Sequence, residues 1–263
     1  MRNKGSRMFR HYLLRLSCRI LILLIFVYFY LFARDRIAPL SEFRLFGPFT
    51  PLHLLWLILM SGMLLHLLPN ARVTLCCRKS RAVDFQPQPD YDPAQLSAYR
   101  RLMNRRALRV ALVWITCNAV PGILYLRQIL GDAEMLLLTL PYFVGDLVCI
   151  LIFCPFQTFF MRNCCCMDCR IFDWGHIMMH TPMLFVPGFF SRSLFITACL
   201  VFLHWELAFA RHPERFWRGS NQAIRCENCR EQLCRIKEPL RRTLGLPATE
   251  QRMPPARRNG NNA

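Results

Sequence analysis

The sequence predicts an all-α, polytopic membrane protein with about six short transmembrane helices and a small cytoplasmic, cysteine-rich module that binds a metal. Three observations lead to this prediction. Hydrophobic residues make up 54% of the 263-residue chain and gather into blocks as long as a membrane-spanning helix. The formal net charge is +18, and the basic residues concentrate between these blocks. Nine of the 14 cysteines follow shortly after an apolar block.

Four apolar blocks each predict a single span, because a bilayer core needs about 17 to 25 apolar residues in a helix. The blocks are Leu16–Ala33, Leu52–Leu68, Leu108–Leu126 and Met135–Phe156. The first contains Arg19, whose side chain would extend to the interface. The third is interrupted at Pro121-Gly122, and a basic helix over Pro93–Arg106 leads into it.

The block Trp174–Ala210 is harder to interpret, because it is too long for one span and carries Arg192 near its middle. A turn at residues 191–193 would divide it into two short spans, Trp174–Phe190 and Leu194–Ala210. The alternative is one interfacial helix followed by one span, which gives five crossings in place of six.

Charge decides the predicted topology, because basic loops stay on the cytoplasmic side of a membrane. Residues 1–15, the loop 69–107 and the tail after Ala210 are all rich in arginine. Only an even number of crossings places all three in the cytoplasm. We therefore predict six crossings, a multi-pass protein of the cell membrane, and both termini in the cytoplasm.

The same charge pattern bears on partners. The chain has 34 Lys and Arg residues against 16 Asp and Glu residues. Such an excess can indicate binding to nucleic acid, but basic cytoplasmic loops account for it here. We therefore expect no nucleic-acid partner. The expected partners are the lipid bilayer, anionic lipid at the basic loops, and a protein whose identity the sequence does not give.

The predicted organisation has several parts in chain order. They are a basic cytoplasmic N-terminus (1–15), transmembrane helices 1 and 2 (16–68), a basic cytoplasmic loop (69–107), transmembrane helices 3 and 4 (108–160), a cytoplasmic cysteine cluster (161–173), a transmembrane hairpin of helices 5 and 6 (174–210), a cytoplasmic cysteine-bearing tail (211–247) and a disordered end (248–263). The end is rich in Pro, Asn, Ala and Arg and cannot bury a core.

Two CxxC pairs predict a zinc site, and they are Cys166 with Cys169 and Cys226 with Cys229. The cytosol keeps thiols reduced, and two CxxC turns supply the four thiolates of a tetrahedral zinc ion. The ion would join the two feet of the last helical hairpin. The alternate ligands are Cys164, Cys165 and Cys234. An iron–sulfur cluster, which also takes four thiolates, is the alternative cofactor.

Two simpler interpretations of the cysteines stay open. Cysteines just past a span are common sites of palmitoylation in eukaryotic proteins, which would account for Cys164–Cys166 and for Cys76 and Cys77. The thiols can also be small packing residues without a special role. That second interpretation is the one predicted for the cysteines inside the spans, which are Cys18, Cys117, Cys149, Cys154 and Cys199.

Asp146, near the middle of the fourth span, is the predicted intramembrane ionisable site, because a carboxylate is costly there. It serves either a transport function or a hydrogen bond that joins helices. His176 and His180 lie four residues apart on one helical face, and Glu206 could complete a second metal site with them. Interfacial histidines bonded to backbone or headgroups are the alternative.

No Ser/His/Asp signature and no glycine-rich phosphate loop occurs in the sequence, which favours a role other than an enzyme and leaves a redox enzyme as an alternative. We expect a structural or partner-docking membrane protein whose zinc site stiffens a cytoplasmic surface. The alternatives are a transporter or channel that uses Asp146, and a membrane redox protein with a cysteine-ligated iron–sulfur site whose span histidines serve a quinone or haem.

Overall fold

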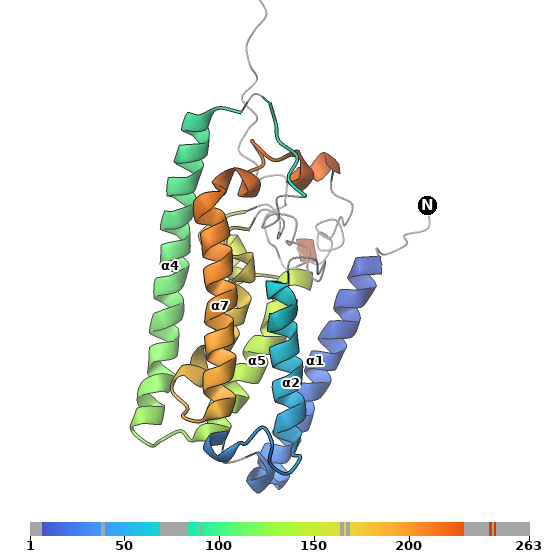
Figure 1. Ribbon diagram of the computed structural model, residues 1–263, viewed down its shortest axis with the longest axis vertical. Helices are drawn as coiled ribbons and strands as arrows, with labels where there is room; N and C mark the ends of the chain where they lie inside the picture. The colour runs from blue at the N-terminus through green and yellow to red at the C-terminus, as the bar shows by residue number, and fades with distance from the viewer. Residues whose placement is uncertain are drawn as a thin grey trace, which may run out of the picture.

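The apolar blocks of the sequence form long helices that lie side by side in one bundle in the computed structural model (Figure 1). The structure describes residues 7–37, 40–68, 84–89, 91–163, 166, 169–228, 242, 243 and 245. The longer helices are α1 (Arg7–Phe32), α2 (Pro51–Leu67), α4 (Pro93–Leu126), α5 (Asp132–Leu151) and α7 (Phe189–Arg211). Short helical turns and an isolated β-bridge between Pro87 and Asn221 make up the other regular structure of the described residues. The predicted all-α class is confirmed for this part of the chain.

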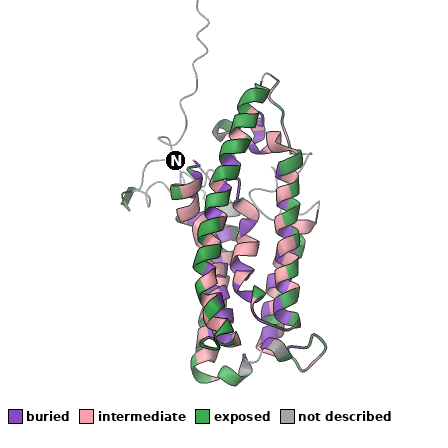
Figure 2. Cartoon of the chain, turned by 90° about the vertical axis from the view of Figure 1, so that its left-hand side faces the viewer, coloured by how far each residue is buried: buried purple, intermediate pink, exposed green. Residues whose placement is uncertain are grey.

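Four helices of the described residues are long and apolar enough to cross a membrane, namely α1 from Arg10 onward, α4, α5 and α7. Helix α2 is also apolar but has only 17 residues. Exposed residues run along the outer faces of the bundle (Figure 2), and many are large and apolar, such as Leu24, Ile115 and Leu203. An exterior with many large exposed apolar side chains suits lipid rather than water. The bundle is therefore compatible with a multi-pass membrane protein.

Local sequence signals set the starts of two of these helices. Asp92 accepts a hydrogen bond from the backbone N–H of Ala94 at 2.8 Å, and Pro93 occupies the first position of α4. At the start of α5, the Glu134 carboxylate accepts a hydrogen bond from the backbone N–H of Gly131 at 2.8 Å. These contacts satisfy N–H groups that the first turn of a helix leaves unpaired. The sequence predicted the start of α4 at Pro93, whereas it placed the start of the fourth span at Met135, inside α5.

Helix α4 continues through Pro121, where the sequence predicted an interruption, and it includes the basic stretch that precedes the third predicted span. Gly122 is buried in this helix because the ring of Phe185 packs directly on it. A Cβ atom added to Gly122 would lie 2.3 Å from the Cζ atom of Phe185. The glycine thus serves close packing rather than a break in the helix.

The structure differs from the predicted hairpin over 174–210 in its first half. In place of one spanning helix, the chain forms a short helix α6 (Gly175–His180) and a 3₁₀ turn η6 (Thr181–Leu184). Both pack against α5 and α7 inside the bundle. A six-residue helix is far too short to cross a bilayer, so this passage depends on its neighbours to cover its backbone.

The turn that precedes α7 also lies earlier than predicted. The chain reverses at Pro187-Gly188, where Gly188 has a φ of 107°, a left-handed conformation that glycine adopts without strain. Pro187 has no backbone N–H and cannot continue a helix in the usual way. Arg192, predicted to lie in the turn, is an exposed residue of the first turn of α7. The position of the turn is therefore set by the backbone preferences of Pro187 and Gly188 and not by the charge of Arg192.

The beginnings of α1 and α4 and the end of α7 lie toward one end of the bundle, at the top of Figure 1. We call this the arginine-rich end, because it carries the exposed side chains of Arg10, Arg100, Arg101, Arg105 and Arg211. The segment after α7 folds back here onto the start of α4. The Tyr99 hydroxyl donates a hydrogen bond to the Phe216 carbonyl at 3.0 Å.

Three groups of buried apolar side chains hold the helices together. The largest group lies between α1, α2, α5 and α7. A second joins α4 to α7 and includes Met161, Trp174 and Phe216 from the connecting segments. The third packs the first turns of α1 against the end of α5 through Tyr12 and Leu147. Helices α1 and α5 are therefore antiparallel neighbours.

The close contact at Gly122 predicts a specific loss of stability. Gly122→Ala should lower the free energy of unfolding in detergent by about 2 kcal/mol, because the added methyl group displaces the Phe185 ring. Gly62→Ala in α2 is the matched control, since no atom lies within 4 Å of the Cβ position of Gly62. Combining Gly122→Ala with Phe185→Ala should cost less than the sum of the two single changes. Equal effects at both glycines would contradict the packing assigned here.

Candidate functional site

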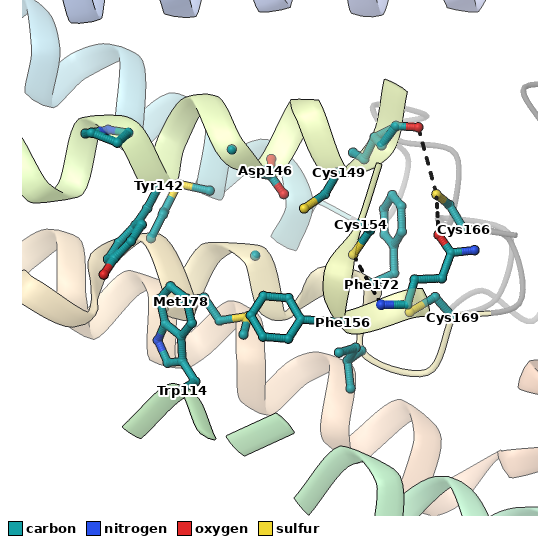
Figure 3. Close-up of a pocket in the computed structure, with 17 residues that line it drawn as sticks. Trp114, Tyr142, Asp146, Cys149, Cys154, Phe156, Cys166, Cys169, Phe172 and Met178 are labelled. Carbon is teal, nitrogen blue, oxygen red and sulfur yellow. Dashed lines mark hydrogen bonds between the residues drawn. The ribbon is translucent and has the colours of Figure 1, made fainter. Parts of the chain in front are cut away.

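A cavity of about 200 Å³ lies at the end of α5, and its wall contains four cysteines (Figure 3). Cys149 belongs to α5 and Cys154 to the link that follows it, while Cys166 and Cys169 come from the segment beyond. Four sulfur atoms from three successive segments therefore converge on one space. This cavity is the candidate functional site.

The fold of the segment after α5 places these cysteines. Helix α5 ends at Leu151, and the chain then forms a π-helical turn, η3 (Phe156–Met161). The backbone N–H of Gln157 donates to the Cys154 sulfur at 3.4 Å. The Cys166 thiol donates to the Gln157 side-chain oxygen at 3.7 Å, a contact drawn in Figure 3. Gln157 is itself buried, so it fixes two of the four cysteines from inside the wall.

Cys166 and Cys169 form the turn that a CxxC sequence is expected to form. The backbone N–H of Cys169 donates to the carbonyl of Cys166 at 3.1 Å, and Cys169 is buried. Such a turn brings two sulfur atoms to one side of the chain. In this structure both cysteines line the cavity.

The rest of the cavity wall is mainly apolar and includes the aromatic rings of Trp114, Tyr142, Phe156 and Phe172. Trp114 of α4 lies 4.8 Å from the ring of Tyr142 and 5.9 Å from the ring of Phe156, measured between ring centres. Phe172 and Met178 complete the apolar wall (Figure 3). A space with these walls favours a flat, apolar ligand.

Asp146 also lines the cavity, and it has a partner that the sequence did not reveal. The Arg19 guanidinium of α1 lies 2.9 Å from the Asp146 carboxylate, and both side chains are largely shielded from solvent. Arg19 also donates to the Phe143 carbonyl at 2.5 Å and lies 4.1 Å from the centre of the Phe143 ring. Arg19 therefore points into the bundle, whereas the sequence predicted that it extends to the interface. This ion pair explains the presence of a carboxylate at position 146, because it joins α1 to α5.

Gly175, at the start of α6, allows this pair to form. A Cβ atom added at Gly175 would lie 2.4 Å from the Asp146 Oδ1 atom. Any side chain at this position would therefore have to displace the carboxylate. The glycine brings α6 close to α5 beside the cavity.

Glu206 is held by an arginine rather than by histidines. The Arg170 guanidinium binds the Glu206 carboxylate through two hydrogen bonds, at 2.6 and 2.5 Å, and its side chain is only 4% exposed. The indole N–H of Trp174 donates to the same carboxylate at 2.7 Å. This Arg170–Glu206 clamp ties the segment just after Cys169 to α7.

The structure does not bring His176 and His180 together with Glu206. The His180 Nδ1 atom lies 2.8 Å from the His176 carbonyl oxygen, and the His176 ring packs 4.4 Å from the ring of His66. His66 in turn lies 3.8 Å from the Asp173 carboxylate. Within the described ranges, no group of three or more His, Cys, Asp or Glu side chains is arranged to hold a metal ion. The predicted second metal site is therefore not formed by these residues.

The predicted four-cysteine zinc site falls only partly within the described residues. Cys166 and Cys169 are described, as is the backbone of Cys226 in the 3₁₀ turn η9 (Cys226–Asn228). The other cysteines of the predicted cytoplasmic clusters lie outside the described residues, namely Cys164, Cys165, Cys229 and Cys234, together with Cys76 and Cys77. The zinc site therefore stays a prediction.

Sequence reasoning missed Cys149 and Cys154, which it treated as packing residues of the fourth span. Both line the cavity beside Cys166 and Cys169. A signal was present, because both cysteines fall in the last turns of the apolar block that leads into the cysteine cluster. Their convergence also needs the break after Leu151, which an uninterrupted apolar block does not reveal.

Comparison of the chain with models of protein families, with curated proteins and with solved structures finds no match.

The Arg170–Glu206 clamp predicts a large penalty for removing one partner. Glu206→Gln should lower the free energy of unfolding by about 3 kcal/mol, because it leaves the buried Arg170 charge without a counter-ion. The combined change Arg170→Leu and Glu206→Leu should cost less than Glu206→Gln alone. Glu214→Gln is the control, since its partner His212 is 43% exposed and the change should be nearly neutral. Similar losses at Glu206 and Glu214 would count against the clamp.

The Arg19–Asp146 pair makes a separate prediction, measurable by a double-mutant cycle in detergent. Arg19→Gln and Asp146→Asn should each destabilise the bundle, because each leaves one charge alone between helices. Together they should cost less than the sum, with a coupling of about 1 kcal/mol or more. Strict additivity would show that the two side chains do not interact in the folded protein.

Proposed function

We propose that this chain is a multi-pass membrane scaffold whose arginine-rich end carries a structural zinc site and docks a protein partner. The proposed ligands are Cys166, Cys169, Cys226 and Cys229. The ion would clamp the segment after α5 to the tail after α7. The arginine-rich end would face the cytoplasm, with both termini on that side.

The observation that carries the proposal is that both cysteine-bearing segments are fixed on the same two residues of α7. The indole N–H of Trp205 donates to the Arg170 carbonyl at 2.7 Å, and the Trp205 ring lies 5.0 Å from the Phe216 ring. Phe209 has the Arg170 guanidinium 3.9 Å from its ring centre and the Phe216 ring at 5.2 Å. Arg170 directly follows Cys169, and Phe216 belongs to the stem that leads to Cys226. The segments that carry the two CxxC pairs are thus both held by Trp205 and Phe209 of α7.

The stem before Cys226 is also well fixed. Ser220 and Asn221 are fully buried, and Ile224 is nearly so. The Ser220 carbonyl accepts a hydrogen bond from the backbone N–H of Gln88 at 2.9 Å. The backbone N–H of Gln222 likewise donates to the Gln86 carbonyl at 2.9 Å. A docked stem limits how far Cys226 can move from the bundle, which favours a shared ion.

Charge supports the orientation and the docking role. Arg100, Arg101 and Arg105 are exposed at the start of α4, and Arg211 is exposed at the end of α7. Basic residues at one end of a membrane bundle favour the cytoplasmic side and attract anionic lipid headgroups. The surface between them, stiffened by the proposed zinc ion, is where we place the partner. Asp146 is accounted for by its pairing with Arg19, and we assign it no transport role.

Metal analysis of the purified protein tests the proposal. We expect about one zinc ion per chain in the wild type, and loss of that zinc in the double variant Cys226→Ser, Cys229→Ser. The double variant should also unfold at lower temperature, because the energy of metal binding contributes to folding. The matched control is Cys18→Ser, Cys117→Ser, which changes two exposed cysteines on the helices and should keep its zinc.

Three outcomes would overturn the zinc site. These are a wild-type protein without metal, a Cys226→Ser, Cys229→Ser variant with full zinc content, and iron with sulfide in place of zinc. The last would favour the iron–sulfur alternative. The orientation is tested separately by a reporter fused to the C-terminus, which should be active only on the cytoplasmic side.

A further inference from the structure

Two cysteines of the cavity, Cys149 and Cys154, form a pair that the proposed zinc site does not use. Their side chains interact with each other, and Figure 3 shows both at the cavity beside Asp146 and Phe156. They are five residues apart in the sequence. In a continuous α-helix, residues at that spacing point about 140° apart around the axis. Their contact therefore exists only because the helix ends between them.

The end of α5 is built to make this contact. The backbone N–H groups of Ile152 and Phe153 both donate to the Val148 carbonyl, at 2.8 and 3.1 Å, which closes the helix. Pro155 then opens the π-helical turn, whose Gln157 N–H holds the Cys154 sulfur at 3.4 Å. Cys154 is thereby turned back over the last turns of α5, toward Cys149.

The cavity beside this pair matches one aromatic ring in size and character. Its volume is about 200 Å³, and an apolar cavity of roughly 150 Å³ is known to hold benzene. Trp114, Tyr142 and Phe156 offer flat faces for stacking. The outer faces of the surrounding helices carry large exposed apolar side chains, which suit a bilayer in which a lipophilic ligand dissolves.

We infer that the cavity binds the ring of a lipophilic quinone, and that Cys149 and Cys154 reduce the quinone to a hydroquinone. The two S–H bonds break and one S–S bond forms between the two sulfur atoms. The thiol pair gives up two electrons and two protons in this step. The quinone takes up both, one proton at each carbonyl oxygen. No other reactant is needed for this single reduction, which leaves the cysteine pair as a disulfide.

A quinone suits this pair for a chemical reason. Oxidising two thiols to a disulfide releases two electrons and two protons, which one quinone ring accepts in full. The aromatic walls hold the ring beside the sulfur atoms, and the bilayer supplies it. The pair is reduced in the resting state because the cytosol keeps thiols reduced.

The test uses the full-length, reduced protein in detergent or lipid nanodiscs, with duroquinone as the probe. All ring carbons of duroquinone are substituted, so a thiol cannot form a stable adduct on a free ring position. We expect the quinone absorbance to fall by one equivalent per chain and the thiol count to fall by two. Peptide mapping should find the new disulfide between Cys149 and Cys154.

Variants separate this reaction from unrelated thiol oxidation. Cys149→Ser and Cys154→Ser should each abolish hydroquinone formation, whereas Cys117→Ser and Cys199→Ser should not change it. Gly145 lines the cavity, and no atom lies within 4 Å of its Cβ position. Gly145→Leu should therefore fill the space and block the quinone, while both thiols still react with iodoacetamide.

The inference is overturned by absence of hydroquinone, by a disulfide that involves other cysteines, or by full activity in Cys149→Ser or Gly145→Leu. It rests on the proposed cytoplasmic orientation but does not require the zinc ion, although Cys166 and Cys169 line the same cavity. Quinone reduction should persist in the double variant Cys226→Ser, Cys229→Ser, so loss of zinc and loss of quinone chemistry can be told apart.

Discussion

The buried clamp between Arg170 and Glu206 is the interaction on which the arginine-rich end of the bundle depends. The Arg170 side chain is 4% exposed and the Glu206 side chain 26%, so the arginine charge is removed from water at a cost that close, two-point hydrogen bonding offsets. Because Arg170 directly follows Cys169, the clamp fixes the cysteine segment to α7. Trp205 and Phe209 extend the same contact to the stem of the tail. One ion pair thus sets the relative positions of two segments that are distant in the chain.

A second ion pair plays the corresponding role between α1 and α5. Arg19 and Asp146 neutralise each other between α1 and α5, where neither charge would be stable alone. The two pairs share a principle, since each arginine also lies over an aromatic ring, Phe143 for Arg19 and Phe209 for Arg170. These two charge pairs are each covered by an aromatic ring, which gives them a structural role before any other.

The cysteine cavity lies between these two pairs, and its shape follows from them. Asp146 forms part of its wall, and Arg170 anchors the segment that closes it. The break after Leu151 then brings Cys149 and Cys154 to the same space as Cys166 and Cys169. The proposed zinc site would use Cys166 and Cys169 of this wall with two cysteines of the tail, whereas the proposed thiol chemistry would use Cys149 and Cys154.

The sequence by itself determined the helical class and the main apolar helices, because block length and hydrophobicity act over neighbouring residues. It also located the start of α4 at Pro93, since the cap at Asp92 is local. Only the tertiary structure decided the broken passage over residues 172–188 and the two ion pairs. Arg19 and Asp146 are separated by 127 positions, and Arg170 and Glu206 by 36. Which charges meet across such distances depends on how helices pack, and helix packing is set by the whole core rather than by any local pattern.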